Sequence, residues 1–234
     1  MFSVAVIPAR SGSKRIPNKN FIKVNGLSLV DHAIELAQAA GVFDEIIVSL
    51  DSWESAKLIS SRVATLHVRS LDLASDQART IDVIKEVITK RRIEFSTNLC
   101  CLYPTSLLLP KKRIVEGLSI LKGNENRFVF AAQQAPSNPL RMFKLDSAKE
   151  EIIFLDQKSV RMNTQDLDPF YTDAGQFYWA SETTWISQNE ILSSTSVPVI
   201  LNKWETIDID SREDLDIVRD LLKIREGKQI DEST

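Results

Sequence analysis

The chain has 234 residues, of which 43% are hydrophobic and 26% charged, and its formal net charge is −3. This size and composition fit one α/β domain with an insertion, or two small domains. The slightly negative charge argues against a nucleic-acid-binding surface, and no apolar run approaches the ~20 residues of a membrane span. No basic leader precedes the first apolar segment. The adjacent Cys100 and Cys101 suit buried thiols on opposite strand faces, so we expect a cytoplasmic protein with small-molecule partners.

The first predicted strand, residues 4–8, leads directly into a cationic loop. Gly12 tolerates a positive φ and the serines beside it add hydroxyl donors, so backbone N–H groups there can converge on an anion. The surrounding cations suit a triphosphate, which needs several scattered donors. Ligands of open α/β sheets bind at strand ends, so we favour a phosphate-binding loop over a solvated basic loop. The loop residues are Ala9, Arg10, Ser11, Gly12, Ser13, Lys14, Arg15, Lys19 and Asn20.

Alternating strands and helices follow this loop. The apolar period predicts a helix over 29–40, with Ser28 and Asp31 as a capping box and Gly41 as its stop. A strand over 45–49, a helix from Asp51 or Ser52 to about Arg62 and a strand over 65–69 come next. This alternation predicts right-handed crossovers and a mostly parallel sheet.

The middle of the chain continues the same pattern. A polar loop over 69–77 precedes a helix from Thr80, the expected N-cap, to Lys90. The apolar run 98–103 predicts a central strand covered on both faces, and it ends in Pro104, Thr105 and Ser106. A helix over 111–122 and a strand over 128–132 are expected after it.

The regular alternation stops after residue 133. Prolines and short strand pieces at 142–145 and 152–155 indicate that residues 136–172 form a lid or an oligomerisation arm, inserted into a core of residues 1–135 and 173–226. The segment 173–179 returns to the sheet. Strands are expected over 197–201 and 206–210, followed by a helix over 211–225, capped by Ser211 and Asp214, and a polar tail, 227–234.

Two carboxylates stand near the end of the chain. In a strand over 206–210, Asp208 and Asp210 would project from the same face. Like charges this close are unfavourable unless a cation lies between them, and oxygen ligands suit Mg²⁺. An exposed strand face that caps the next helix explains the pair equally well. The segment 173–179 fits either a carbohydrate site or a buried aromatic strand, and His32 and His67 are interpreted as structural.

Five segments together resemble the acylneuraminate cytidylyltransferase family, the CMP-nonulosonic acid synthetases. They are Ile7 to Asn20, Phe43 to Ser49, Leu73 to Asp76, Tyr103 to Ser106, and Ile207 to Asp210, and they span nearly the whole chain. Cys100 to Tyr103, Thr164 to Leu167 and Asp173 to Trp179 are most similar to the group that acts on pseudaminic acid, a nine-carbon 2-keto sugar acid.

The resemblance implies a Rossmann-like nucleotidyltransferase fold, a homodimer joined through the inserted arm, and transfer of CMP from CTP to the sugar acid with release of pyrophosphate. It implies Mg²⁺, or Mn²⁺, on Asp208 and Asp210, which would also help to orient or deprotonate the acceptor hydroxyl. Arg10, Lys14 and Lys19 would hold the triphosphate. The resemblance further implies a nucleoside site at Asn20, Arg69, Thr80, Tyr103, Pro104, Thr105 and Ser106, and a sugar site at Arg141, Gln165, Asp173, Gln176 and Tyr178.

The chain departs from the family pattern at two places. The arginine that usually precedes Thr164 is missing, so Arg161 or Arg141 would have to bind the sugar carboxylate. Leu107 and Leu109 replace a proline and a basic residue after Ser106. Two alternatives therefore stay open, namely another acceptor (legionaminic acid or an epimer, N-acetylneuraminic acid, or Kdo) and a non-catalytic nucleotide-binding protein.

Overall fold

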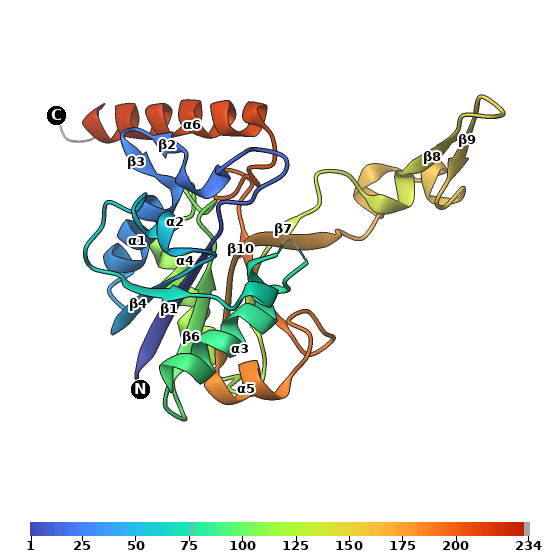
Figure 1. Cartoon of the computed structure of the whole chain (residues 1–234). Coiled ribbons are helices and arrows are strands. Elements are labelled where there is room, and N and C mark those ends of the chain that lie inside the picture. The colour runs from blue at the N-terminus through green and yellow to red at the C-terminus, as the bar shows by residue number, and fades with distance from the viewer. Residues whose placement is uncertain (76, 232–234) are drawn as a thin grey trace.

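A computed structural model describes residues 1–75 and 77–231 of the chain, and a seven-stranded sheet forms its centre (Figure 1). The strand order is β11-β7-β10-β6-β1-β4-β5. Neighbouring strands are parallel except where β10 pairs antiparallel with β6 and with β7. The strands are β1 (Ser3–Ala9), β4 (Glu45–Leu50), β5 (Thr65–Val68), β6 (Asn98–Leu102), β7 (Val129–Gln134), β10 (Tyr171–Ser181) and β11 (Val197–Leu201).

Helices cover both faces of the sheet. Alternate residues of β1 point to opposite sides, so Val4 and Val6 pack with α3 while Ala5 and Ile7 pack with α1 and α4. Cys100 and Cys101 divide in the same way, and both are buried free thiols. The prediction of a mostly parallel sheet between two helical layers is confirmed. The helices are α1 (Leu29–Ala40), α2 (Trp53–Ala56), α3 (Thr80–Arg91), α4 (Lys111–Leu121), α5 (Glu182–Ser187) and α6 (Arg212–Asp231).

Helix α1 shows why the local sequence signals succeed. The Ser28 hydroxyl accepts a hydrogen bond from the Asp31 N–H at 3.1 Å and donates to the Asp31 carboxylate at 2.7 Å. Gly41 ends the helix with φ of 66°, a left-handed conformation that glycine adopts at little cost. These residues confirm both predicted ends of the helix.

The C-terminal helix α6 packs against the loop that follows β1. Ile209, Leu215 and Val218 form a small core with Ile16 and Leu29. The short strands β2 (Lys23–Val24) and β3 (Leu27–Ser28) lie in the same region. This small core brings the segment before α6 and the start of α6 next to the loop after β1 (Figure 1).

The segment between β7 and β10 extends away from the sheet as an arm, which is drawn at the upper right of Figure 1. Its base is closed by a hydrogen bond from the Ala135 N–H to the Phe170 carbonyl. Its outer part is an antiparallel hairpin of β8 (Phe143–Asp146) and β9 (Glu151–Phe154). Several large apolar side chains of the arm are exposed, among them Phe143, Leu145, Ile152, Ile153 and Leu155.

Three local predictions are wrong. The helix expected to reach Arg62 is only α2, because the Ser60 and Ser61 N–H groups donate to the Asp31 carboxylate instead of continuing the helix. Thr80 is the first helical residue of α3 rather than its N-cap, which is Arg79. No strand forms over 206–210.

The path of residues 206–210 and the length of α6 explain the differences near the end of the chain. The chain turns after β11 and crosses β10, where the Thr206 hydroxyl contacts the Ala174 carbonyl at 3.4 Å, so it cannot pair along the sheet. Helix α6 continues past Arg225 to Asp231, and the rest of the predicted polar tail, 232–234, lies outside the described residues. Ser211 and Asp214 do form the predicted capping contacts, with the Ser211 hydroxyl accepting from the Asp214 N–H at 3.1 Å. No helix in the described ranges is long and apolar enough to cross a membrane.

Candidate active site

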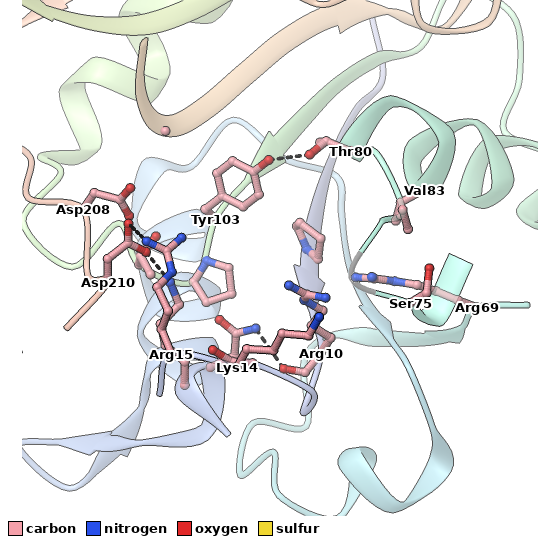
Figure 2. Close-up of a pocket in the computed structure, with 18 of the residues that line it drawn as sticks. Arg10, Lys14, Arg15, Arg69, Ser75, Thr80, Val83, Tyr103, Asp208 and Asp210 are labelled. Carbon is pink, nitrogen blue, oxygen red and sulfur yellow. Dashed lines mark hydrogen bonds and ion pairs between the residues drawn. The ribbon is translucent and has the colours of Figure 1, made fainter. Parts of the chain in front are cut away.

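A cavity of about 600 Å³ opens beyond the carboxyl ends of the parallel strands (Figure 2). Its walls come from the loop after β1, the segments after β5 and β6, the start of α3, β10 and the segment before α6. Charged side chains of both signs line it, namely Arg10, Lys14, Arg15, Lys19, Arg69, Asp208 and Asp210. The uncharged lining includes Pro8, Ser13, Asn20, Ser75, Ala78, Thr80, Val83, Tyr103, Pro104, Thr105, Gly175 and Tyr178.

The cationic loop and the late carboxylates meet at one side of this cavity. Arg15 Nη1 lies 2.5 Å from an Asp210 oxygen, and Lys19 Nζ lies 3.4 Å from the other one. Lys19 Nζ also donates to the Ile209 carbonyl at 2.6 Å. Figure 2 shows Asp208 and Asp210 beside Arg15, with Arg69 and Ser75 on the opposite wall. Opposite charges nearly 200 residues apart in sequence therefore meet in one site.

Asp208 is the less neutralised of the two carboxylates. Among the described residues, none donates a hydrogen bond to it. Burial, and then the neighbouring charge of Asp210, raise its pKa above the ordinary value for aspartate, while Lys19 and Arg15 oppose the shift. A carboxylate in this position is destabilised as an anion, so a cation placed beside it would be favourable.

The carboxylate pair fits a divalent cation of the Mg²⁺ type. Two aspartates that line one cavity offer hard oxygen ligands, and Mg²⁺ is commonly held by one or two carboxylates plus phosphate oxygens. No group of three or more His, Cys, Asp or Glu side chains suited to a metal occurs within the described ranges. The protein therefore supplies part of a coordination shell, and a bound phosphate would have to supply more of it.

Asp51, which follows β4, anchors the loop after β1 through hydrogen bonds with Ser11. The Asp51 carboxylate accepts hydrogen bonds from the Ser11 N–H at 2.7 Å, the Ser11 hydroxyl at 2.6 Å and the Ser55 hydroxyl at 2.7 Å. Ser11 therefore points to Asp51 and not into the cavity, contrary to the expected role as an anion donor. Gly12 has no positive φ, so the predicted need for glycine there is also wrong.

Arg69 is a buried cation in the cavity wall. Only 8% of its surface is exposed. Its Nε donates to the Ser49 hydroxyl at 3.0 Å and its Nη2 to the Ser49 carbonyl at 2.9 Å. Burial lowers the pKa of Arg69 to about 10, so the guanidinium keeps its charge at neutral pH. Asn20 is held in a comparable way by a 3.1 Å hydrogen bond to the Arg10 carbonyl.

Two tyrosines separate this cavity from a second one of about 350 Å³. The Tyr103 hydroxyl shares a 2.5 Å hydrogen bond with Thr80, and the Tyr178 hydroxyl donates to Asp173 at 2.5 Å. The two rings meet edge to face at 5.8 Å. Burial raises the pKa of both phenols, so both remain O–H donors at neutral pH.

The second cavity combines apolar side chains with charged ones and one amide. Besides Thr80, Tyr103 and Tyr178, which line both cavities, it is lined by Arg79, Ile81, Asp173, Asn189, Glu190, Ile191 and Leu192. Gly175, with φ of 59°, lies where the pairing of β10 with β7 shifts register, and its N–H donates to Asp173 at 3.0 Å. The bend that glycine permits brings β10 to both cavities.

Some of the predicted site residues lie elsewhere. Arg141 and Gln165 are in the arm, where Arg141 contacts Thr164 at 3.1 Å, and neither lines either of these two cavities. The Ser106 hydroxyl and the Tyr103 N–H both donate to the carbonyl of buried Gln176 at 3.0 Å, so Ser106 and Gln176 join β6 to β10. Ala9 is a buried strand residue, and Arg161 lies in the arm. Leu107 and Leu109 pack into apolar clusters and carry no phosphate contact.

The sequence pattern did not assign Asp51 to the site, although a signal for it was present, whereas Gly175 belongs to the segment 173–179 already considered for a carbohydrate site. Asp51 follows a parallel strand next to β1, so its carboxylate had to lie beside the loop after β1. Gly175 stands inside an otherwise continuous strand pattern, where an isolated glycine indicates a bulge or a close approach. Ser75, within the family segment Leu73 to Asp76, and Val83 of α3 also line the cavity.

Comparison with known proteins decides the family. The family model described as "Cytidylyltransferase" matches residues 4–222. The chain belongs to the cytidylyltransferase family. It is 32% identical over 227 residues to a pseudaminic acid cytidylyltransferase of Campylobacter jejuni, covering 96% of this chain and 97% of that one. A CMP-N,N'-diacetyllegionaminic acid synthase of Legionella pneumophila is 29% identical, with 95% and 97% covered.

Solved structures support the same fold. A CMP:2-keto-3-deoxy-manno-octonic acid synthetase complexed with CTP superposes with a TM-score of 0.70 at 15% identity, covering 96% of this chain and all of that one. The cytidylyltransferase has the nucleotidyltransferase fold and belongs to a family of enzymes. The family assignment therefore disfavours the alternative of a non-catalytic binding protein.

Proposed function

We propose that this cytidylyltransferase transfers CMP from CTP to pseudaminic acid, giving CMP-pseudaminic acid and pyrophosphate. The observation that carries the proposal is the convergence of the cationic loop, the two aspartates and Arg69 on one 600 Å³ cavity. The relatives named above include enzymes of pseudaminic and legionaminic acid activation, and both match almost the full length of the chain.

The charge arrangement suits nucleotidyl transfer. In the reaction an acceptor hydroxyl oxygen attacks the α-phosphorus of CTP, the bond from that phosphorus to the bridging oxygen breaks, and pyrophosphate leaves with the electron pair. Arg10, Lys14 and Lys19 would neutralise the charge that develops on the leaving pyrophosphate. Arg69 on the opposite wall and Asn20 on the cationic loop, both held by hydrogen bonds, would fix the nucleoside.

Asp208 and Asp210 would hold Mg²⁺, which neutralises phosphate charge and aligns the reacting oxygens when bound. One of the two carboxylates would also help to orient or deprotonate the acceptor hydroxyl. Asp210 would keep Arg15 and Lys19 at the cavity edge through the ion pairs described above.

The second cavity suits the part of the acceptor farthest from the reacting hydroxyl. Ile81, Ile191 and Leu192 offer apolar surface for a methyl group, and Asn189 and Arg79 offer hydrogen-bonding groups for an amide. Acylamino substituents combine these two features. An acylated nonulosonic acid therefore fits the site better than an unacylated acid such as Kdo.

We also propose that two copies assemble through the arm. Its exposed apolar side chains form the kind of surface that soluble proteins cover with a partner. Arg141 and Gln165 lie in the same arm and line neither of the two cavities, so the arm of a second copy would be the one to bring them to a sugar. Sedimentation of the wild type and of an Ile152→Asp, Ile153→Asp variant would test this, and a wild-type monomer would contradict it.

The acceptor is tested with a panel of sugar acids. Pyrophosphate release from CTP and Mg²⁺ should be measured with pseudaminic, legionaminic, N-acetylneuraminic and Kdo acceptors at matched concentrations. We expect the highest kcat/KM with pseudaminic acid and the lowest with Kdo. Preference for legionaminic acid would correct the acceptor alone, whereas no release with any acid would overturn the proposed reaction.

A further inference from the structure

A buried histidine lies directly behind Arg69. His67 in β5 is paired in register with Ser49 in β4, and both residues are buried. The Ser49 hydroxyl oxygen is 3.2 Å from His67 Nδ1 and 3.0 Å from Arg69 Nε. Because side chains alternate along a strand, Arg69, two residues after His67, lies on the same side of the sheet. The three side chains form one continuous hydrogen-bonded series that ends at the cavity.

The direction of this series follows from the donors that each group has. A guanidinium only donates, so the Ser49 oxygen accepts from Arg69. The single Ser49 hydroxyl proton can then be donated to an unprotonated His67 Nδ1. In that arrangement His67 is neutral and carries its proton on Nε2, an atom that is buried without a hydrogen-bond partner among the described residues.

The surroundings agree with this state. Burial lowers the pKa of His67, and the charged groups that act on it are Glu86, Lys90 and Arg91 of α3 together with Arg69. Three of these four are cations, which disfavour a second proton on the imidazole. Glu86 opposes them, and its Oε2 is also buried and unpaired within the described residues.

We propose that His67 is a positioning residue for nucleotide binding. Its Nδ1 accepts a hydrogen bond from the Ser49 hydroxyl, which orients the Ser49 oxygen to accept from Arg69 and so holds Arg69 in the cavity wall. This rests on the proposed binding of CTP in that cavity. Ser49 uses Nε and Nη2 of Arg69, and no described residue accepts a hydrogen bond from Nη1. The fixed guanidinium can present that group to the nucleotide without losing side-chain freedom on binding.

A pair of matched variants separates positioning from packing. His67→Asn keeps an acceptor oxygen close to the place of Nδ1, whereas His67→Leu has a similar volume and no acceptor. CTP affinity should be measured by calorimetry without any sugar acid. We expect about tenfold weaker binding in His67→Leu and a change of less than about twofold in His67→Asn. Equal affinities in His67→Leu and the wild type would overturn the proposal.

A double-mutant cycle shows whether the effect passes through Arg69. If it does, His67→Leu should weaken CTP binding no further in an Arg69→Met background. An undiminished effect in that background would contradict the proposal. Wild-type protein that does not bind CTP at all would instead refute the proposed function.

The tautomer gives a test that does not depend on the folding of a variant. The chain has only two histidines, so nitrogen chemical shifts of the imidazole rings can be assigned in the wild-type protein from through-space contacts of each ring with its neighbours. At neutral pH we expect His67 to carry its proton on Nε2 alone. A proton on Nδ1 would exclude the proposed direction of the series.

Discussion

The Lys19 ammonium group donates to the Ile209 carbonyl at 2.6 Å and lies 3.4 Å from the Asp210 carboxylate. One side chain of the loop after β1 thus fastens the segment that carries both candidate metal ligands. Lys19 is only 19% exposed, so this contact is partly shielded from solvent. Lys19 thus has a structural role, through its contact with Ile209, and a proposed role in binding phosphate. Measurements of stability and of kinetics separate the two roles.

Lys19→Ala should lower the free energy of unfolding by about 1–3 kcal/mol, because a charged hydrogen bond to a partly buried carbonyl is lost. It should also raise the KM for CTP. Chemical denaturation and steady-state kinetics measure the two effects. Lys23→Ala, at an exposed lysine in β2, is the control and should change neither quantity. Unchanged unfolding in Lys19→Ala would show that the contact with Ile209 does not hold the segment in place.

Asp51 should make stability depend on pH in the acid range. Burial alone would raise its pKa, but the hydrogen bonds from Ser11 and Ser55 lower it below the ordinary value. A carboxylate with a lowered folded pKa stabilises the protein above its unfolded pKa of ~3.9, and that contribution is lost as the pH falls through the folded pKa.

Asp51→Asn should therefore lower the free energy of unfolding by about 1–3 kcal/mol at pH 7 and flatten its decline below pH ~4. Urea denaturation at a series of pH values measures both. Because Asp51 anchors the loop after β1 through Ser11, the KM for CTP should rise as well. If the free energy of unfolding fell equally with decreasing pH in the wild type and in Asp51→Asn, the lowered pKa of Asp51 would not be the cause of the acid dependence.

Gly117 in α4 tests the packing of the central sheet. A Cβ at this position would lie 2.8 Å from Trp179 Cδ1 and 2.9 Å from a Phe177 ring carbon, and both rings are fully buried. Gly117→Ala should destabilise the protein by about 1–3 kcal/mol through overpacking. Gly123→Ala is the matched control, since the nearest atom to its Cβ is 3.8 Å away. Equal melting temperatures of the two variants would refute the tight contact.

The hydrogen bond between Tyr103 and Thr80 joins β6 to α3 at the boundary of the two cavities. Tyr103→Phe and Thr80→Val should each cost about 1 kcal/mol, and the double variant should cost less than the sum because both remove the same contact. Tyr171→Phe, at an exposed tyrosine, serves as the control. Additive losses would mean that the two hydroxyls do not interact.

Much of the fold could be predicted because its signals are local. The caps at Ser28, Gly41 and Ser211 predict helix ends, and the apolar runs of β1 and β6 predict buried parallel strands. The strand expected over 206–210 failed because pairing depends on where the chain runs after β11. The predicted alternation of apolar and acidic side chains in this segment is still observed, because Ile209 is in an apolar cluster while Asp208 and Asp210 line the cavity.

The site was harder to predict where a side chain has a partner far away in sequence. Ser11 resembles an anion donor until Asp51 is seen to occupy both of its donors, 40 residues later. Arg141 and Gln165 match the sugar-binding motifs of the family, yet the arm carries them away from the cavities of their own chain. No local pattern contains either kind of information.

The central claim is that a nucleotide triphosphate lies between the cationic loop and the aspartate pair, with Mg²⁺ on Asp208. The most direct measurement is a calorimetric titration of CTP, with and without Mg²⁺, into the wild type and Asp208→Asn, a variant that should fold normally because Asp208 is exposed and accepts no hydrogen bond from the described residues. We expect Mg²⁺ to tighten CTP binding at least about tenfold in the wild type and less than about twofold in Asp208→Asn. An equal effect of Mg²⁺ on both proteins would contradict the account.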